Sequence, residues 1–331
     1  MKSHNKTSIL SAIGGNCIVM VAKLIGFLFT GSSAMLAETI HSFADILNQS
    51  FLLVGIIRAE QKPDKEHNTG YGRAQFVWAI ISAVGIFFLG CGVTMYHGIH
   101  QLLHPTPFHE YRIWPIAVLA FSLLVEGTVL FIAWKELRQS AQGKPFWNYL
   151  REEADPSTVA VFMEDSGACI GVMIAFISIG LTSYTHQTYW DAIGSIIIGI
   201  LLGGIAIWLI QRNKDLLLGR SIPSADLEIL HKILRQKHYL GNIDHIRTEI
   251  IGSSDYDIQL EIEFNEHKLL QTLPINLQEE YNNIHCYKDF CAASQKISLL
   301  SINHLIETID SLEEEIKTNI PNIRFIDIEP N

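Results

Sequence analysis

The sequence lacks the short motifs that mark common enzyme classes. It contains no HExxH, no P-loop and no GxSxG, and its polar residues form no recognisable nucleophile–base pair. Its five cysteines are scattered without a CxxC spacing, so no disulfide framework is indicated. Basic residues are too few for a nucleic-acid partner, with 24 Lys plus Arg against 34 Asp plus Glu. We therefore expect no enzyme, no nucleic-acid binding and no prosthetic group.

Charge is distributed very unevenly along the 331 residues. Residues 1–220 hold 15 basic and 15 acidic residues, whereas residues 221–331 hold 9 basic and 19 acidic ones. The whole net charge of -10 therefore belongs to the last third of the chain. A charge-poor, apolar part followed by an acidic part predicts a membrane domain, residues 1–212, and a soluble domain, residues 213–331.

Six stretches of the first part are long and apolar enough to span a bilayer as helices. They lie at about 8–29, 35–57, 75–101, 113–134, 157–183 and 189–210. The loops 58–74 and 135–156 each hold four Lys or Arg residues, whereas the other loops that connect the six stretches are almost free of these residues. The positive-inside rule then places both termini in the cytoplasm. We expect a six-pass protein of the bacterial inner membrane, with an organelle membrane as the alternative.

The soluble part shows the order helix, strand, strand, helix, strand. The expected helices are 224–237, with a Ser N-cap, and 298–318; the expected strands are 243–251, 256–264 and 322–329. A Gly-Ser-Ser-Asp stretch between the first two strands indicates a hairpin. This α-β-β-α-β order predicts a small ferredoxin-like α+β domain, with residues 265–297 as an insertion.

Ionisable residues inside membrane helices are costly and therefore mark candidate functional sites. In the second expected helix, Glu38, His41 and Asp45 follow i, i+3, i+7 spacing and so share one face. The fifth helix supplies Glu164 and Asp165. An imidazole with carboxylates suits Zn²⁺, and less exclusively Mn²⁺, Fe²⁺ or Co²⁺. The alternative is that these groups only hold the helices together.

Several separate segments together resemble the cation diffusion facilitator family. The shared positions are Asn16, Lys23, residues 31–45 (GSSAMLAETIHSFAD), 67–75 (HNTGYGRAQ) and 191–202 (DAIGSIIIGILL). Further segments are similar to the branch that includes a mitochondrial zinc exporter. They are residues 157–171, Glu126-Gly127 and Leu218-Gly219. The resemblance implies a six-helix, dimeric divalent metal/proton antiporter with a cytoplasmic, metallochaperone-like domain.

The resemblance also implies a ligand set, with one departure. HSFAD matches the HxxxD of the family, which assigns His41 and Asp45 to the metal, and Asp165 matches a second ligand position. The partner position in the fifth helix falls on Val161, which cannot bind a metal. The fourth donor is then Glu164, Glu38 or water, and we favour Glu164.

Two further positions carry open alternatives. Asp64 and His67 match a family metal site in the loop after the second helix, but Tyr71 replaces a further histidine there. A solvated loop is the favoured interpretation, with metal binding as the alternative. Glu126, isolated in the fourth helix, is a candidate for carrying the exchanged proton or for pairing with Lys23.

These expectations combine into one function with two alternatives. The sequence predicts a homodimeric, proton-coupled efflux transporter for a divalent metal, with Zn²⁺ as the first choice of substrate. One alternative is a transporter of Mn²⁺, Fe²⁺ or Co²⁺ within the same family. The other is a membrane-anchored metal sensor, in which the position of Val161 reflects a degenerate transport site.

Overall fold

The computed structural model describes residues 2–105, 113–141, 145–152, 156–252 and 255–331. The chain divides into two compact units, Met1–Leu218 and Gly219–Asn331. The boundary expected at residue 212 falls inside the last helix of the first unit, which continues to Leu217. The two units are described separately.

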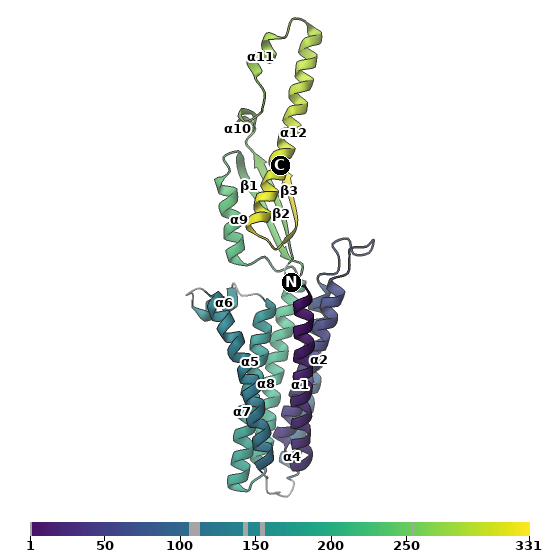
Figure 1. Cartoon of the computed structure of the whole chain (residues 1–331), viewed down its shortest axis with the longest axis vertical. Coiled ribbons are helices and arrows are strands. Elements are labelled where there is room, and N and C mark those ends of the chain that lie inside the picture. Colours follow the sequence, from purple (N-terminus) through teal and green to yellow (C-terminus); the bar gives the residue numbers. More distant parts are fainter. Residues whose placement is uncertain (1, 106–112, 142–144, 153–155, 253–254) are drawn as a thin grey trace. The chain divides into compact units, whose positions relative to one another are not determined.

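The first unit is a bundle of six spans, all of which are long and apolar enough to cross a membrane (Figure 1). The spans are α1 (Lys2–Thr30), α2 (Ser33–Ala59), α3 to α4 (Ala74–Leu103), α5 (Ile113–Ser140), α7 (Pro156–Thr185) and α8 (Tyr189–Leu217). The third span consists of α3 (Ala74–Gly85), a π-helical segment (Ile86–Val93) and α4 (Thr94–Leu103). The six-helix prediction is confirmed, and the protein is an integral membrane protein.

One segment expected as a loop contains additional helix. Of residues 135–156, α5 takes the first part up to Ser140, and a short helix, α6 (Phe146–Glu152), follows. Val159 and Phe162 of α7 are buried in one cluster with Leu137 of α5 and Leu150 of α6. Burial of Leu150 against α5 and α7 explains why residues 146–152 fold as a helix although the surrounding segment is rich in charged residues.

Helices α2 and α8 lie at the centre of the bundle. Helix α2 contacts α1, α3, α7 and α8, and α8 also contacts α3, α4 and α7. Small residues allow this approach. At Gly194 of α8, a Cβ atom would collide with the Ser178 hydroxyl of α7, and at Gly199 it would lie 2.6 Å from Cγ of Met95. Large apolar side chains such as Leu28, Phe29 and Leu124 instead point outward, toward the lipid.

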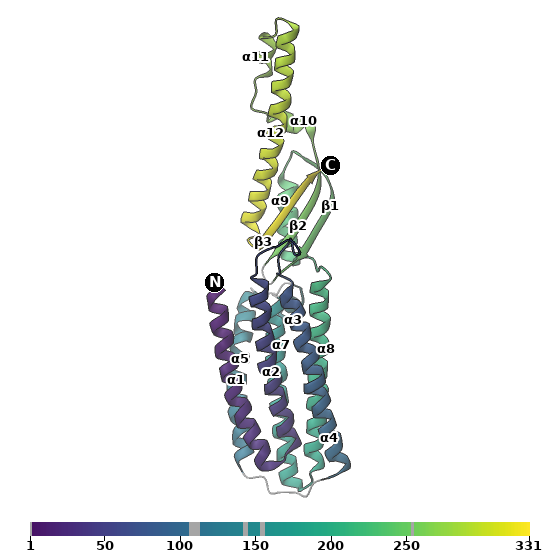
Figure 2. The same cartoon turned by 90° about the vertical axis from the view of Figure 1, so that its right-hand side faces the viewer.

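The second unit is a small α+β fold with a three-stranded sheet of order β1-β2-β3 (Figure 2). Strands β1 (Leu240–Ile250) and β2 (Tyr256–Phe264) pair antiparallel, as the hairpin signal predicts, and β3 (Ile323–Pro330) pairs parallel to β2. Helices α9 (Ser224–Gln236) and α12 (Tyr287–Asn319) contact one another. Their buried residues, with alternate residues of β2, form the core of the unit. They include Leu230, Leu234, Ile258, Ile262, Leu312 and Ile316.

Two local expectations for this unit are wrong. The N-cap of α9 is Pro223, so Ser224 is the first helical residue and not the cap. The long helix begins at Tyr287 instead of residue 298, so it includes part of the expected insertion. It begins there because the Asp289 carboxylate accepts hydrogen bonds from the backbone N–H groups of His285 and Cys286, both at 3.1 Å. The rest of the insertion forms α10 (Glu266–Gln271) and α11 (Leu277–Asn282).

Candidate metal transport site

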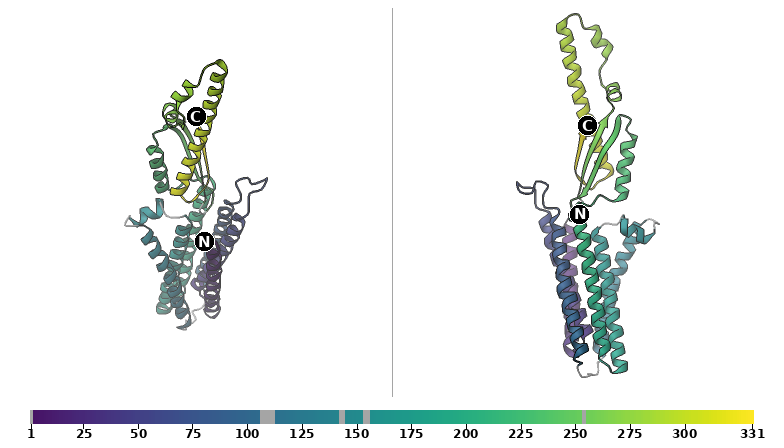
Figure 3. Two further views of the ribbon diagram at one scale, coloured as in Figure 1. Left: turned by 45° about the horizontal axis from the view of Figure 1, so that its top comes forward. Right: turned by 180° about the vertical axis from the view of Figure 1, so that it is seen from behind.

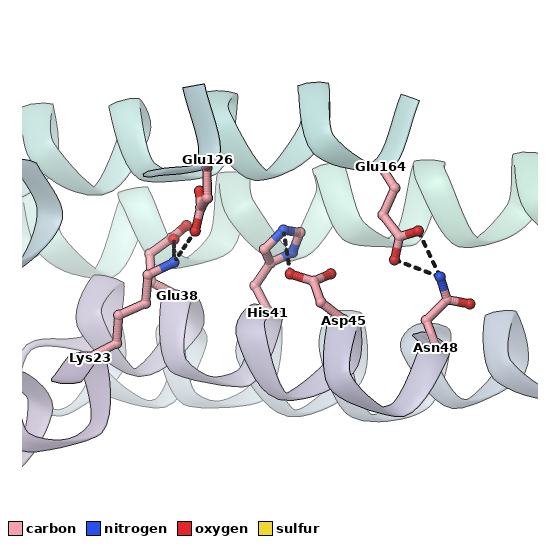
Figure 4. Close-up of polar contacts among 7 residues, drawn as sticks. All are labelled: Lys23, Glu38, His41, Asp45, Asn48, Glu126 and Glu164. Atoms are coloured by element: carbon pink, nitrogen blue, oxygen red, sulfur yellow. Dashed lines mark hydrogen bonds and ion pairs between the residues drawn. The ribbon is translucent and has the colours of Figure 1, made fainter. Parts of the chain in front are cut away.

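A row of polar side chains follows one face of α2 (Figure 4). It consists of Glu38, His41, Asp45 and Asn48, which are spaced by three, four and three residues. This spacing keeps all four on one stripe of a helix, along about 15 Å of its length. Side chains from α1, α3, α5 and α7 meet this row. The face predicted from the sequence therefore exists and continues for one more turn.

The end of the row nearest the N-terminus of α2 is a buried three-residue ion network. Nζ of Lys23 lies 2.9 Å from a carboxylate oxygen of Glu38 and 2.9 Å from one of Glu126. Lys23 and Glu38 are fully buried, and Glu126 is nearly so. Gly171 of α7 leaves room for the Glu38 carboxylate, since a Cβ atom there would lie 2.7 Å from Oε1 of Glu38. The network joins α1, α2 and α5, and in it Glu126 pairs with Lys23.

His41 and Asp45 occupy the middle of the row. Nε2 of His41 lies 3.7 Å from Oδ2 of Asp45, which is an ion-pair distance but longer than a hydrogen bond. The imidazole is only 2% exposed, and neither of its nitrogens has a hydrogen-bond partner among the described residues. Oδ2 of Asp165 on α7 is also buried and without a partner. Unpaired buried polar atoms destabilise a fold by about 1–3 kcal/mol each. Nδ1 and Nε2 of His41 and Oδ2 of Asp165 are therefore available to bind a ligand, which would offset this penalty.

The far end of the row is held by a chain of hydrogen bonds across three helices. The Asn48 amide donates to both carboxylate oxygens of Glu164, at 2.8 and 2.6 Å, and accepts from the Ser82 hydroxyl at 2.8 Å. An ionised carboxylate only accepts hydrogen bonds, so the contact with Glu164 fixes which side of the Asn48 amide carries the nitrogen. The Glu164 carboxylate also lies close enough to Asp45 to interact with it electrostatically. This chain joins α3, α2 and α7.

The expected ligands thus lie on facing helices, but they do not surround a single metal position. Among the described residues, no three His, Cys, Asp or Glu side chains are gathered closely enough to hold a metal ion together. His41 and Asp45 adjoin each other on α2, and Glu164 and Asp165 stand opposite on α7. The side chain of Val161 lies outside the described part of the chain.

The candidate loop site has its own internal bonding. Oδ2 of Asp64 accepts a hydrogen bond from the Tyr71 hydroxyl at 2.7 Å, and Oδ1 accepts from the backbone N–H groups of Glu66 and His67. The bond from Tyr71, followed by that from the His67 backbone, holds the pKa of Asp64 below its usual value. The His67 and Asp64 side chains are both half exposed. These contacts agree with a solvated loop.

The N-terminus of α2 is fixed by residues that the sequence did not indicate. The buried Asp191 carboxylate of α8 accepts from the Ser32 hydroxyl and the Ser33 backbone N–H, both at 2.6 Å. The Ser33 hydroxyl in turn bonds to His97 of α4 at 2.7 Å and to Gln101. Asp191 lies in the first turn of α8, where the helix dipole favours a negative charge. Only the packing of α8 on α2 shows that it caps a different helix.

Asn48 was also missed, although a signal for it is present. It lies three residues after Asp45 and seven after His41, so it continues the helical stripe. An amide carries no charge, which is why it does not stand out in a search for ionisable groups.

Comparison with known proteins decides the family. A model of the cation efflux transmembrane domain matches residues 9–218, which includes all six spans. The chain belongs to the cation efflux family. This result confirms the resemblance to the cation diffusion facilitators, and it identifies residues 9–218 as a cation efflux transmembrane domain.

Individual relatives of this cation efflux protein carry different metals in their names. It is 35% identical over 336 residues to the mitochondrial proton-coupled zinc antiporter SLC30A9 of Xenopus laevis, covering 99% of this chain and 60% of the relative. It is 32% identical to metal tolerance protein C4 of Arabidopsis thaliana, covering 98% of this chain and 73% of the relative. It is 25% identical to the manganese efflux system protein MneP of Bacillus subtilis, covering 83% and 91%. The chain thus spans about 60% of the length of the vertebrate antiporter that it matches.

Proposed function

We propose that this protein exports a divalent metal, with Zn²⁺ as its preferred substrate, in exchange for protons. The observation that carries the proposal is the buried His41 imidazole, whose two nitrogens lack partners among the described residues, directly beside Asp45. A neutral imidazole with a carboxylate is a donor pair typical of zinc. The name of the SLC30A9 relatives and the 99% coverage of this chain support the same substrate and the same coupling ion.

The ligand set that we propose is His41 and Asp45 from α2 with Asp165 and Glu164 from α7. Glu38 is the weaker candidate for the fourth position, because its carboxylate already pairs with the Lys23 ammonium. Glu164 accepts from the neutral Asn48 amide and interacts with Asp45, and a neutral amide gives up a carboxylate at lower cost than an ammonium does. At the alternative secondary site, Asp64 and His67, a metal would have to displace the Tyr71 hydroxyl.

Proton exchange follows from the chemistry of these ligands. A metal binds only the neutral imidazole and the ionised carboxylates, so protons and metal compete for the same atoms. An imidazole has an unperturbed pKa of about 6.5, so modest pH differences across a membrane shift the competition. Two interhelical networks, Lys23–Glu38–Glu126 and Ser82–Asn48–Glu164, lie on either side of His41 and Asp45 along α2. We propose that one network loosens when the site faces one side of the membrane, and the other when it faces the opposite side.

The proposal extends to the role of Glu126 and to the orientation of the protein in the membrane. Glu126 is held by Lys23, which favours a structural role, with proton transfer as the alternative. We propose that both termini lie in the cytoplasm or an equivalent inner compartment, since Lys and Arg concentrate in the loops on that side. The names of the antiporter relatives make an organelle membrane as strong a candidate as a bacterial inner membrane. A homodimer is proposed from the resemblance to the family.

A metal panel in reconstituted vesicles tests the choice of substrate. We expect flux of Zn²⁺ to exceed that of Mn²⁺, Fe²⁺ and Co²⁺, and we expect Asp45→Ala to abolish it in a protein that still folds. Larger Mn²⁺ flux would favour the second candidate, which the similarity to the manganese efflux protein supports. Binding of metal without flux of any of the four would favour the membrane-anchored sensor.

A further inference from the structure

The first half of α12 carries an exposed apolar stripe that the fold of one chain leaves uncovered. Leu299, Ile302 and Ile306 are 63%, 58% and 51% exposed. Near the C-terminal end of the same helix, Leu312 and Ile316 are fully buried. The first half extends beyond the sheet beside α10 and α11 (Figure 3). An isoleucine or leucine triplet exposed to this degree on a soluble unit indicates an interaction surface.

The stripe belongs to a heptad pattern. We call the α12 seam the residues Lys288, Ala292, Gln295, Leu299, Ile302 and Ile306, together with Glu313 one heptad beyond Ile306. Their spacing alternates between four and three residues up to Ile306, which is the spacing of a coiled-coil seam. The first six are exposed, and Glu313 is partly exposed. Such a regular seam fits another helix better than it fits an irregular surface.

The side of α12 next to the insertion is already occupied. Nε2 of His304 lies 2.8 Å from the Thr272 hydroxyl that follows α10, and Lys296 bonds to Glu280 of α11. These contacts hold α10 and α11 against α12, and none of them uses a residue of the seam. The seam is therefore a separate surface that stays open after the insertion has folded.

Charges at the two ends of the seam identify its partner. The seam begins at Lys288 and ends at Glu313, and the residues between them are apolar except for Gln295. When two copies of α12 run antiparallel with Leu299 facing Ile302 of the second copy, Gln295 faces Ile306 and Lys288 faces Glu313. Both ends then form an ion pair of opposite charges, Leu299 and Ile302 cover each other at the centre, and Ile306 packs against the aliphatic part of Gln295. A parallel pair would instead place Lys288 against Lys288 and Glu313 against Glu313.

We propose that the α12 seam docks on the seam of a second copy of this chain as an antiparallel, two-stranded coiled coil. The arrangement is isologous, as a twofold dimer requires, because each facing pair, such as Leu299 with Ile302 or Lys288 with Glu313, occurs twice by symmetry. The proposal does not depend on the metal, the direction of transport or the transport site. It assigns a role to the segment 265–297 and the helix that follows it, since together they hold the seam away from the sheet.

Site-directed cross-linking of the full-length protein tests the pairing. The five native cysteines are first replaced by alanine, and Lys288→Cys and Glu313→Cys are then made in separate, differently tagged chains. The two positions lie about 38 Å apart along one helix, so a bond between them joins two copies. We expect a cross-linked dimer when the two proteins are mixed, and none from either protein alone.

Ile302→Asp in both chains should abolish the cross-link, because it places a charge at the centre of the seam. Leu277→Asp is the matched control: Leu277 of α11 is also 58% exposed but lies outside the seam, so the cross-link should persist. Absence of a bond in the mixture, a Lys288→Cys chain that links to itself, or equal loss in both Asp variants would overturn the proposal. If alanine replacement unfolds the protein, a benzophenone residue in place of Ile302 in the native-cysteine chain gives the same decision. Capture of a second copy near Leu299 supports the pairing, and capture of no second copy overturns it.

Discussion

The buried network around Lys23 allows a quantitative prediction for the stability of the membrane unit. Lys23→Met keeps the length of the side chain but removes the ammonium that lies 2.9 Å from both Glu38 and Glu126. Two carboxylates then share one buried site without a cation. Removing one partner from a buried ion network costs about 3–5 kcal/mol, which is a large part of the 5–15 kcal/mol typical of a folded protein.

The control for this prediction removes all three charges. In the triple variant Lys23→Met/Glu38→Gln/Glu126→Gln no buried charge is left unpaired, so we expect most of the lost stability to return. The assay is an unfolding titration with sodium dodecyl sulfate in mixed micelles, followed by tryptophan fluorescence. A free energy of unfolding for Lys23→Met within about 1 kcal/mol of the native value, or a triple variant less stable than the single one, would refute the reasoning.

Three further predictions test separate contacts. Tyr71→Phe removes the hydroxyl that lowers the pKa of Asp64, so this pKa should rise toward its usual value in a ¹³C-carboxyl NMR titration. Because the native pKa is lowered, the stability that Asp64 gives the loop is present at neutral pH and is lost as the pH falls through that value; an unchanged titration would contradict this. Gly171→Ala should lower the free energy of unfolding by about 1–3 kcal/mol, because the added Cβ would lie 2.7 Å from Oε1 of Glu38. An unchanged unfolding midpoint would contradict this, since it would mean that α2 and α7 can move apart at no cost. Glu164→Gln should weaken zinc binding, measured by calorimetry, far more than Glu38→Gln, and the reverse ranking would move the fourth ligand to Glu38.

The six spans and the face of α2 could be predicted from the sequence because both depend on local spacing. A run of about 20 apolar residues specifies a membrane helix, and i, i+3, i+7 spacing places Glu38, His41 and Asp45 on one side of it. The contacts between helices depend on packing, which spacing does not specify. The roles of Asn48 and Asp191 therefore appeared only in the structure. Asn48 is hydrogen-bonded to Ser82 and Glu164, and Asp191 accepts a hydrogen bond at the N-terminus of α2.

The second unit, Gly219–Asn331, shows the same division. Its strands and hairpin follow from alternation of apolar residues, and their order is as expected. The start of α12 was placed eleven residues too late, because the segment before residue 298 is polar and lacks an apolar period facing a core. The cap formed by Asp289 initiates this helix without any burial, and its exposed half is the part that we propose to pair with a second copy.

The central claim is that one site exchanges a divalent metal for protons at His41 and Asp45. The most direct measurement follows both fluxes at once in proteoliposomes, with a zinc-sensitive dye inside and a pH dye on the same side. We predict that zinc entry is accompanied by proton movement in the opposite direction, and that His41→Ala abolishes both signals. A flat pH signal during zinc flux, or full zinc flux in the His41→Ala protein, would contradict the account.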